Sequence, residues 1–292
     1  MRRAHFLQIA FLFIASACLT ETIAQQVEPQ ETTATARAFL NRGLEQYRAG
    51  RFLDAIEMFA EAIRIKRDYA EAYNNLGMAY ANINRYTEAV ESLRASIHFD
   101  SKLAQAYYNL GTVYYNQGQL EEAIKPLHSA IALKPDYAWA HNNLGVIYYK
   151  LGRFNEAIDS YKQALRFKPD WAEAYYMLAL ALYERGRSRE EIEALKRAIA
   201  LKPDYAEAHN SLGVAYFNLK RYKEASAAFD EAIRLKPDFS LARYNLGAMS
   251  LVINRRETAL EQYNALKSLS TELATRLYGG IYRGMVLSLS DR

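Results

Sequence analysis

The stretch Ala206–Phe239, AEAHNSLGVAYFNLKRYKEASAAFDEAIRLKPDF, is 34 residues long, and variants of it follow one another without insertion. Six glycines occur at the same phase of this period: Gly43, Gly77, Gly111, Gly145, Gly213 and Gly247. Ala179 fills the remaining place. A fixed period of this length predicts a solenoid, in which similar units stack on their neighbours. Positions within a unit are numbered from 1 to 34 below, so that these residues all lie at position 8.

The spacing of apolar and small residues in this unit resembles the tetratricopeptide (TPR) repeat. The residues that carry the resemblance are Leu212, Gly213, Tyr216, Ala225, Phe229, Ala232 and Pro237. Seven copies cover residues 36–273, with the ranges 36–69, 70–103, 104–137, 138–171, 172–205, 206–239 and 240–273. The resemblance implies an all-α fold, a TPR α-solenoid in which antiparallel helix pairs form a right-handed superhelix with the first helices on its concave side. Residues 274–292 lie beyond the last copy, and a capping helix from about Thr271 to Gly284 is predicted to close the array, followed by a tail.

Local signals place the ends of the helices. Position 15 is glycine or asparagine in six copies and Lys220 in the other, which predicts a left-handed residue that closes the first helix at position 14. Proline at position 32 ends the second helix, because it cannot continue one. The aspartate that follows, as in Asp68, Asp170 and Asp204, is predicted to cap the next first helix.

Small residues indicate where helices approach closely. Glycine at position 8 lies between large side chains at positions 4 and 11, and the alanine at position 20 is predicted to lie near it. Alanine at position 3 in all seven copies predicts the contact between successive repeats. The fifth copy has Glu191 at position 20, and its carboxylate is expected to turn outward or to loosen the helix pair.

The N-terminus predicts export. Met1–His5 is basic, and the apolar run Phe6–Leu19 is shorter than the roughly 20 residues of a membrane span. This pattern is typical of a secretory signal peptide, residues 1–24, followed by a linker over residues 25–35. Alternatively, the sequence ending at Cys18 resembles a bacterial lipobox, which implies a lipid on that thiol. The expected location is periplasmic, secreted or membrane-anchored as a bacterial lipoprotein, with membrane contact only through Cys18.

Composition and motifs argue against several functions. The net charge is +4 with both signs interspersed, whereas nucleic acid binding favours a strongly basic face. A single cysteine excludes an internal disulfide or a zinc ribbon. The sequence contains no HExxH, Walker or GxSxG motif. We therefore expect a protein that is not an enzyme and that uses no metal and no cofactor.

Asparagine recurs at position 6, on the edge of the expected concave face. The residues are Asn41, Asn75, Asn109, Asn143 and Asn245. A side-chain amide both donates and accepts hydrogen bonds, so a ladder of amides can hold the backbone of an extended peptide, as the TPR resemblance implies. The alternative is that these amides bind neighbouring helices.

Aromatic residues recur on the same face. Position 12 carries Tyr47, Tyr115, Tyr149, Tyr183 and Phe217, and position 5 carries Tyr108, Tyr176 and Tyr244. The rings suit either packing between repeats or recognition of a ligand. The pattern predicts a scaffold that binds a protein or an extended peptide in the concave groove. The alternative is an envelope protein that binds glycan or peptidoglycan through these rings.

Overall fold

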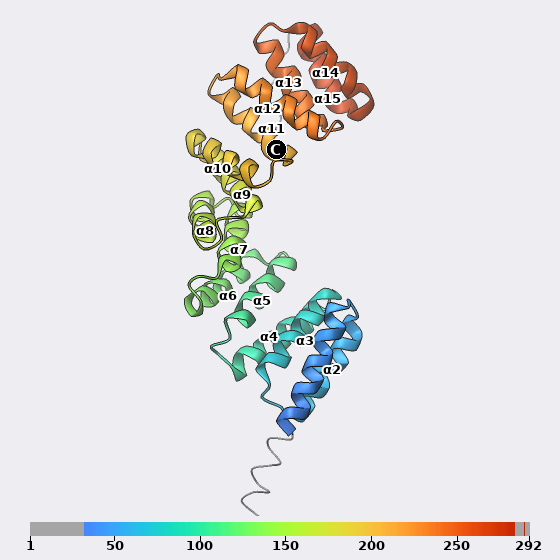
Figure 1. Cartoon of the computed structure of the whole chain (residues 1–292), viewed down its shortest axis with the longest axis vertical. Coiled ribbons are helices and arrows are strands. Elements are labelled where there is room, and N and C mark those ends of the chain that lie inside the picture. Colours follow the sequence, from blue (N-terminus) through green and yellow to red (C-terminus); the bar gives the residue numbers. More distant parts are fainter. Residues whose placement is uncertain (1–31, 284–288, 290–292) are drawn as a thin grey trace, which may run out of the picture. The chain divides into compact units, whose positions relative to one another are not determined.

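The computed structural model describes residues 32–283 and residue 289, and every regular element in this range is an α-helix (Figure 1). The helices follow one another as antiparallel pairs, one pair to each 34-residue repeat, which confirms the predicted TPR α-solenoid. The opening helix covers residues 32–48. It is followed by α2 (Phe52–Ile65), α3 (Ala70–Asn82), α4 (Tyr86–Phe99), α5 (Ala104–Asn116), α6 (Leu120–Leu133), α7 (Ala138–Lys150), α8 (Phe154–Phe167), α9 (Ala172–Glu184), α10 (Ser188–Leu201), α11 (Ala206–Asn218), α12 (Tyr222–Leu235), α13 (Ser240–Val252), α14 (Arg256–Leu269) and α15 (Thr271–Arg283).

The chain divides into two compact units, one ending at Pro135 and one beginning at Asp136. In the described range, the first unit holds helix 32–48 and α2–α6, and the second holds α7–α15. Within each unit, a helix packs most extensively on its partner in the same repeat and next on the following repeat. The stability of each unit is therefore the sum of contributions from repeats and from their neighbours.

A residue in the left-handed conformation closes the turn inside every repeat, as position 15 predicts. The φ angles lie between 58° and 76° at Gly50, Asn84, Gly118, Gly152, Gly186, Lys220 and Asn254. Lys220 adopts φ 58° even though this conformation costs a residue with a Cβ about 1–2 kcal/mol. The packing of the helix pair thus imposes the turn whatever side chain stands there.

We expect Lys220→Gly to stabilise the second unit by about 0.5–1 kcal/mol, because glycine adopts a positive φ without a steric cost and loses only part of this gain through its more flexible unfolded chain. Gly186→Lys is the matched reverse exchange, and it should destabilise by a similar amount. No atom lies within 4 Å of a Cβ added at Gly186, so only the backbone conformation is tested. Urea unfolding followed by circular dichroism measures both changes. If Lys220→Gly leaves the midpoint unchanged, the turn stores no strain.

Glycine at position 8 makes room for the side chain at position 24, and not mainly for position 20 as the sequence predicts. A Cβ added at Gly213 would lie 2.5 Å from Cε1 of Phe229, a ring without exposed surface. Position 20 contributes its backbone, since a Cβ added at Gly77 would lie 3.0 Å from the carbonyl oxygen of Ala89. Small residues at both positions bring the helices together, and the larger residue at position 24 fills the space that remains.

Alanine at position 3 lies in the contact between successive repeats, as predicted. Ala72, Ala106, Ala174, Ala208 and Ala242 are at most 1% exposed. Ala38, in the first repeat, is exposed, because no repeat precedes it within the described residues.

The predicted aspartate caps are wrong. The N-cap of α3 is Tyr69 and that of α11 is Tyr205, and neither makes a side-chain capping bond. The aspartates Asp68, Asp170 and Asp204 each stand one residue before the N-cap. The helices begin where position 34 packs, one residue later than the capping pattern requires.

Glu191 also departs from expectation. Its side chain has no exposed surface, and α9 and α10 still form a closely packed pair. The carboxylate does not turn outward, because the Cα–Cβ bond at position 20 points into the helix pair, where Ala157 and Ala225 are equally buried.

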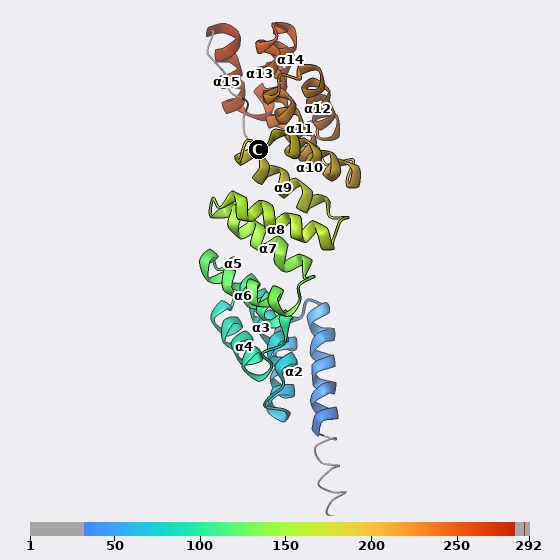
Figure 2. The same ribbon diagram turned by 90° about the vertical axis from the view of Figure 1, so that its left-hand side faces the viewer.

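Helix α15 closes the second unit where a capping helix is predicted. Figure 2 shows it beside α13 and α14, on which it packs. Leu277 has no exposed surface, and its Cδ2 lies 2.6 Å from the place a Cβ would take at Gly247. The leucine of the cap therefore fills the hole that position 24 fills in other repeats.

The N-terminal predictions fall mostly outside the described residues. These are the signal peptide over residues 1–24, lipidation at Cys18 and most of the linker. Residues 32–35 are helical, so the first helix begins before the predicted end of the linker at residue 35. None of the helices in residues 32–283 combines the length and apolar composition that crossing a membrane requires.

Candidate functional site

Two of the five predicted ladder asparagines link successive first helices. Asn109 is 4% exposed and its Nδ2 donates to Oδ1 of Asn74 over 2.8 Å. Asn245 is fully buried and its Nδ2 donates to Oδ1 of Asn210 over 3.0 Å. Both bonds join position 6 of one repeat to position 5 of the repeat before it. These two amides therefore hold repeats together and do not face solvent.

The other three ladder asparagines are accessible. Asn41 is exposed, and Asn75 and Asn143 are partly exposed. The Nδ2 of Asn75 donates to the carbonyl oxygen of Glu71 one turn earlier, over 2.9 Å, which leaves its Oδ1 available to a ligand donor. The first unit thus presents Asn41 and Asn75, and the second presents Asn143.

The position-12 rings mostly pack within their own repeats, against the ring at position 17. The pairs are Tyr47 with Phe52, Tyr149 with Phe154, and Phe217 with Tyr222, with centroids 5.4, 5.4 and 5.7 Å apart. Aromatic pairs at these distances stabilise a fold beyond the area that they bury. Intra-repeat packing therefore accounts for three of these rings.

Tyr115 and Tyr183 also lie at position 12, but position 17 is Leu120 and Ser188 in their repeats. Both tyrosines are partly exposed. Each shares its helix with a partly exposed tyrosine seven residues earlier, Tyr108 on α5 and Tyr176 on α9, which in a helix is the same face.

The position-5 rings differ in their surroundings. Tyr244 has no exposed surface, and burial raises the pKa of its hydroxyl. Tyr176 lies with its ring centroid 5.0 Å from that of Tyr205. Burial raises the pKa of the Tyr205 hydroxyl, and the adjacent Tyr176 adds to this effect. The hydroxyls of Tyr205 and Tyr244 therefore remain protonated at neutral pH.

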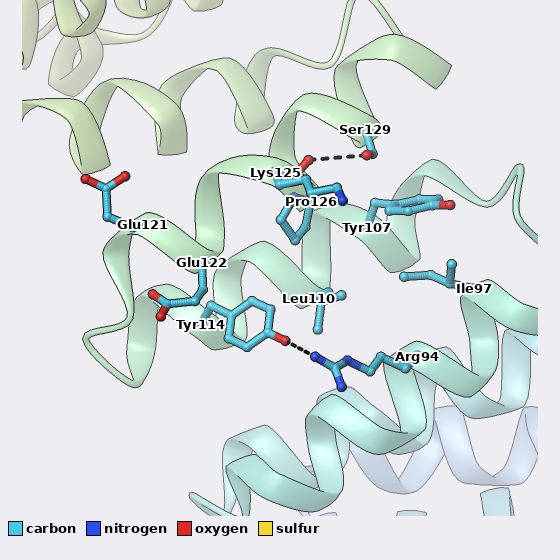
Figure 3. Close-up of a pocket in the computed structure, with 10 residues that line it drawn as sticks. All are labelled: Arg94, Ile97, Tyr107, Leu110, Tyr114, Glu121, Glu122, Lys125, Pro126 and Ser129. Carbon is cyan, nitrogen blue, oxygen red and sulfur yellow. Dashed lines mark hydrogen bonds between the residues drawn. The ribbon is translucent and has the colours of Figure 1, made fainter.

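A pocket of about 430 Å³ lies in the first unit, between α4 and the helix pair of the third repeat (Figure 3). Its floor is apolar and is made by Ile97, Tyr107, Leu110, Tyr114 and Pro126. Its rim is charged and carries Arg94, Glu121, Glu122 and Lys125, with Ser129 beside them. The volume lies within the range of roughly 300–1,000 Å³ that is typical of ligand pockets.

The same positions form a second pocket in the fifth repeat, of about 340 Å³. It is lined by Lys162 of α8 together with Tyr175, Leu178, Leu182, Arg189, Glu190, Glu193, Ala194 and Arg197. The Nζ of Lys162 pairs with Oε2 of Glu190 at 3.1 Å, and Arg187 pairs with the same carboxylate. In contrast to Glu122 of the third repeat, Glu190 at this rim is already paired with a lysine and an arginine of the chain itself.

Neither pocket is predicted by the sequence pattern, which places ligand binding on the first helices. One signal was present. Pro126 lies inside α6, where proline is unfavourable, and it lines the first pocket. Since proline has no N–H, the carbonyl of Glu122 receives no helical hydrogen bond from that position.

Among residues 32–283 and 289, no three His, Cys, Asp or Glu side chains lie together as a metal-binding group.

Tandem helix pairs of one length, with buried alanine at position 3 and left-handed turns at position 15, define a TPR solenoid. The chain belongs to the family of the cilia and flagella-associated protein 70 C-terminal domain, whose family model matches residues 2–270.

Solved structures with this fold include three relatives. YrrB, described as a TPR protein with an unusual peptide-binding site, is 24% identical over 63% of this chain and 95% of its own, with a TM-score of 0.58. MamA is 30% identical over 56% of this chain and 96% of its own, with a TM-score of 0.52. PilF of Pseudomonas aeruginosa is 20% identical over 71% of this chain and 94% of its own, with a TM-score of 0.62. No curated protein matches the chain.

Proposed function

We propose that this chain is a non-catalytic protein-interaction scaffold that binds an extended peptide along the exposed faces of its first helices. The observation that carries the proposal is the division of the asparagine ladder, in which Asn41, Asn75 and Asn143 keep exposed surface while Asn109 and Asn245 are buried in bonds between repeats. The peptide-binding site of YrrB supports the same function for a related fold. Each neutral amide bond contributes about 0.5–1.5 kcal/mol, so affinity comes from several modest contacts.

The proposal predicts that Asn41→Ala combined with Asn75→Ala, both on first helices of the first unit, weakens capture of the partner by about 5- to 100-fold, which corresponds to two lost hydrogen bonds. Proteins retained by the immobilised wild-type chain are identified by mass spectrometry, and each is then titrated against the variant. Circular dichroism should show unchanged helicity.

Asn109→Ala is the matched control. It removes a buried amide that bonds Asn74, so we expect it to lower the free energy of unfolding by about 1–3 kcal/mol and to leave affinity unchanged below the melting temperature. Loss of affinity in this control, with none in the double variant, would contradict the proposed peptide face.

We also propose that the protein works outside the cytoplasm, a proposal that rests on the sequence of residues 1–24. Mass spectrometry of the mature N-terminus decides between cleavage after Ala24 and a lipid on Cys18. The glycan alternative predicts retention on peptidoglycan that is lost when Tyr115, Tyr149 and Tyr183 are replaced by alanine. A peptide scaffold predicts no retention on this polymer.

A further inference from the structure

An arginine at position 16 makes the same two contacts in the second, fourth and sixth repeats. Its guanidinium lies over the tyrosine ring at position 11, with the guanidinium carbon 4.7, 4.5 and 4.5 Å from the ring centroid. It also pairs with the glutamate at position 19. The three sets are Arg85 with Tyr80 and Glu88, Arg153 with Tyr148 and Glu156, and Arg221 with Tyr216 and Glu224. Hydrogen bonds from Arg153 and Arg221 hold the pKa of Glu156 and Glu224 below its ordinary value.

The third repeat keeps the tyrosine and the glutamate but lacks the arginine. Position 11 is Tyr114, position 19 is Glu122, and position 16 is Gln119. Within the described residues Glu122 makes no ion pair, although it lies on the rim of the pocket. Glutamine is too short and carries no charge, so it cannot replace either contact. The third repeat therefore presents a carboxylate and a ring face arranged to receive a cation.

The nearby cations of this protein do not fill that place. Arg94 of α4 donates from Nη2 to the hydroxyl of Tyr114 over 2.8 Å, at the end of the ring. In the view of Figure 3, Glu122 lies on the other side of the Tyr114 ring from Arg94. Lys125 is exposed and stands on α6 itself, three residues beyond Glu122. No arginine of the third repeat therefore stands where Arg85, Arg153 and Arg221 stand in their own repeats, because position 16 is Gln119.

The apolar floor of the pocket adjoins this vacant place. Leu110 and Pro126 are buried, and Ile97 and Tyr107 are partly buried around them. The pocket volume of about 430 Å³ is large enough for one large apolar side chain. Pro126, which lines the pocket, also leaves the carbonyl oxygen of Glu122 without its helical donor one turn earlier in α6.

We propose that the third repeat binds a partner segment in which an arginine stands next to a large apolar residue. The guanidinium takes the place of the missing position-16 arginine, over the ring of Tyr114 and paired with Glu122, and the apolar side chain occupies the floor. Arginine suits the place better than lysine, because its planar guanidinium both stacks on a ring and pairs with a carboxylate. This surface is formed by α4, α5 and α6, and it does not depend on the peptide face proposed for the first helices.

The test uses the full chain and short labelled peptides with a central Leu-Arg, Leu-Gln or Leu-Glu flanked by glycine and serine. Binding is measured by fluorescence anisotropy at low salt, and the contact is located by the amide NMR shifts of residues 114–129. We expect the Leu-Arg peptide to bind at least about 10-fold more tightly than the Leu-Gln peptide, as is usual when one partner of a hydrogen bond is charged.

Gln119→Arg is the decisive variant. It supplies the arginine that stands at position 16 in the six other repeats, so it should keep the fold and reduce binding of the Leu-Arg peptide by at least about 10-fold. Glu122→Gln should cause a similar loss. Glu88→Gln makes the same chemical change at position 19 of the second repeat, where Arg85 already occupies the site, and it should leave binding unchanged.

Three results would overturn the proposal. The first is undiminished binding to the Gln119→Arg protein. The second is binding of the Leu-Gln or Leu-Glu peptide as tight as that of Leu-Arg, which would show that the floor or Arg94 and Lys125 determine recognition. The third is a wild-type dimer in sedimentation that Gln119→Arg converts to monomer, which would assign the pocket to a second copy of the chain. Substitution of Asn41 and Asn75 should not alter this titration, so the two proposals fail separately.

Discussion

Gly213→Ala is expected to destabilise the second unit by up to about 2 kcal/mol. The added Cβ would lie 2.5 Å from Cε1 and 2.6 Å from Cδ1 of Phe229, whose ring has no exposed surface into which it can move. Overpacking of this kind costs about 1–3 kcal/mol and occasionally more, and the better helix propensity of alanine offsets about 1 kcal/mol. Urea unfolding monitored by circular dichroism measures the difference.

The fifth repeat supplies the control for this experiment, since it carries Ala179 at position 8 and Leu195 at position 24, both fully buried. Gly213→Ala with Phe229→Leu copies that combination, and it should recover most of the stability lost in the single variant. If the single variant is as stable as wild type, close packing of position 24 is not the reason for glycine at position 8.

Leu277→Ala is expected to cost the second unit about 2–5 kcal/mol, the range for truncating a buried leucine. Leu277 belongs to the cluster that joins α15 to the last repeat, together with Tyr244, Ala248, Leu266 and Ile281. Its loss leaves a cavity against Gly247 and weakens the packing of the cap on α13 and α14. Hydrogen exchange should show faster amide exchange in α15 first and then in α13 and α14.

Thr275→Ala is the matched control on the same helix. Thr275 is exposed, and its hydroxyl bonds only the carbonyl of Thr271 in its own helix, over 2.8 Å. A surface change of this kind should alter stability by less than about 0.5 kcal/mol. Equal exchange rates in the Leu277→Ala and Thr275→Ala proteins would show that the cap does not stabilise the repeat beneath it.

Much of the fold follows from the period alone, because each repeat applies the same local rules. The left-handed turn at position 15 and the buried alanine at position 3 both stand where the sequence predicts. Two predictions were wrong for one reason: the aspartate N-caps, and position 20 as the main neighbour of the position-8 glycine. Both depend on how a large side chain, at position 34 or at position 24, packs against another helix, and spacing within one helix does not show this.

The candidate site was less predictable, since it depends on residues one repeat apart. Asn109 is buried because Asn74 stands at position 5 of the preceding repeat and accepts its hydrogen bond. For Asn75, position 5 of the preceding repeat is Leu40, which has no amide, so no such pair forms. The vacancy beside Tyr114 becomes visible in the same way, when Gln119 is compared with the arginines at position 16 of other repeats. Reading along one repeat shows neither feature.

The amide pairs between repeats restrict how this array can be lengthened or shortened. Position 5 alternates along the chain between asparagine and tyrosine from Asn74 onward, so its true period is 68 residues, twice 34. Excision of the sixth repeat alone would set the buried amide of Asn245 against Tyr176. Excision of the fifth and sixth together would set it against Asn142 and restore a matching amide. Deletions, duplications and chimaeras that move two repeats at a time therefore preserve these buried amide pairs.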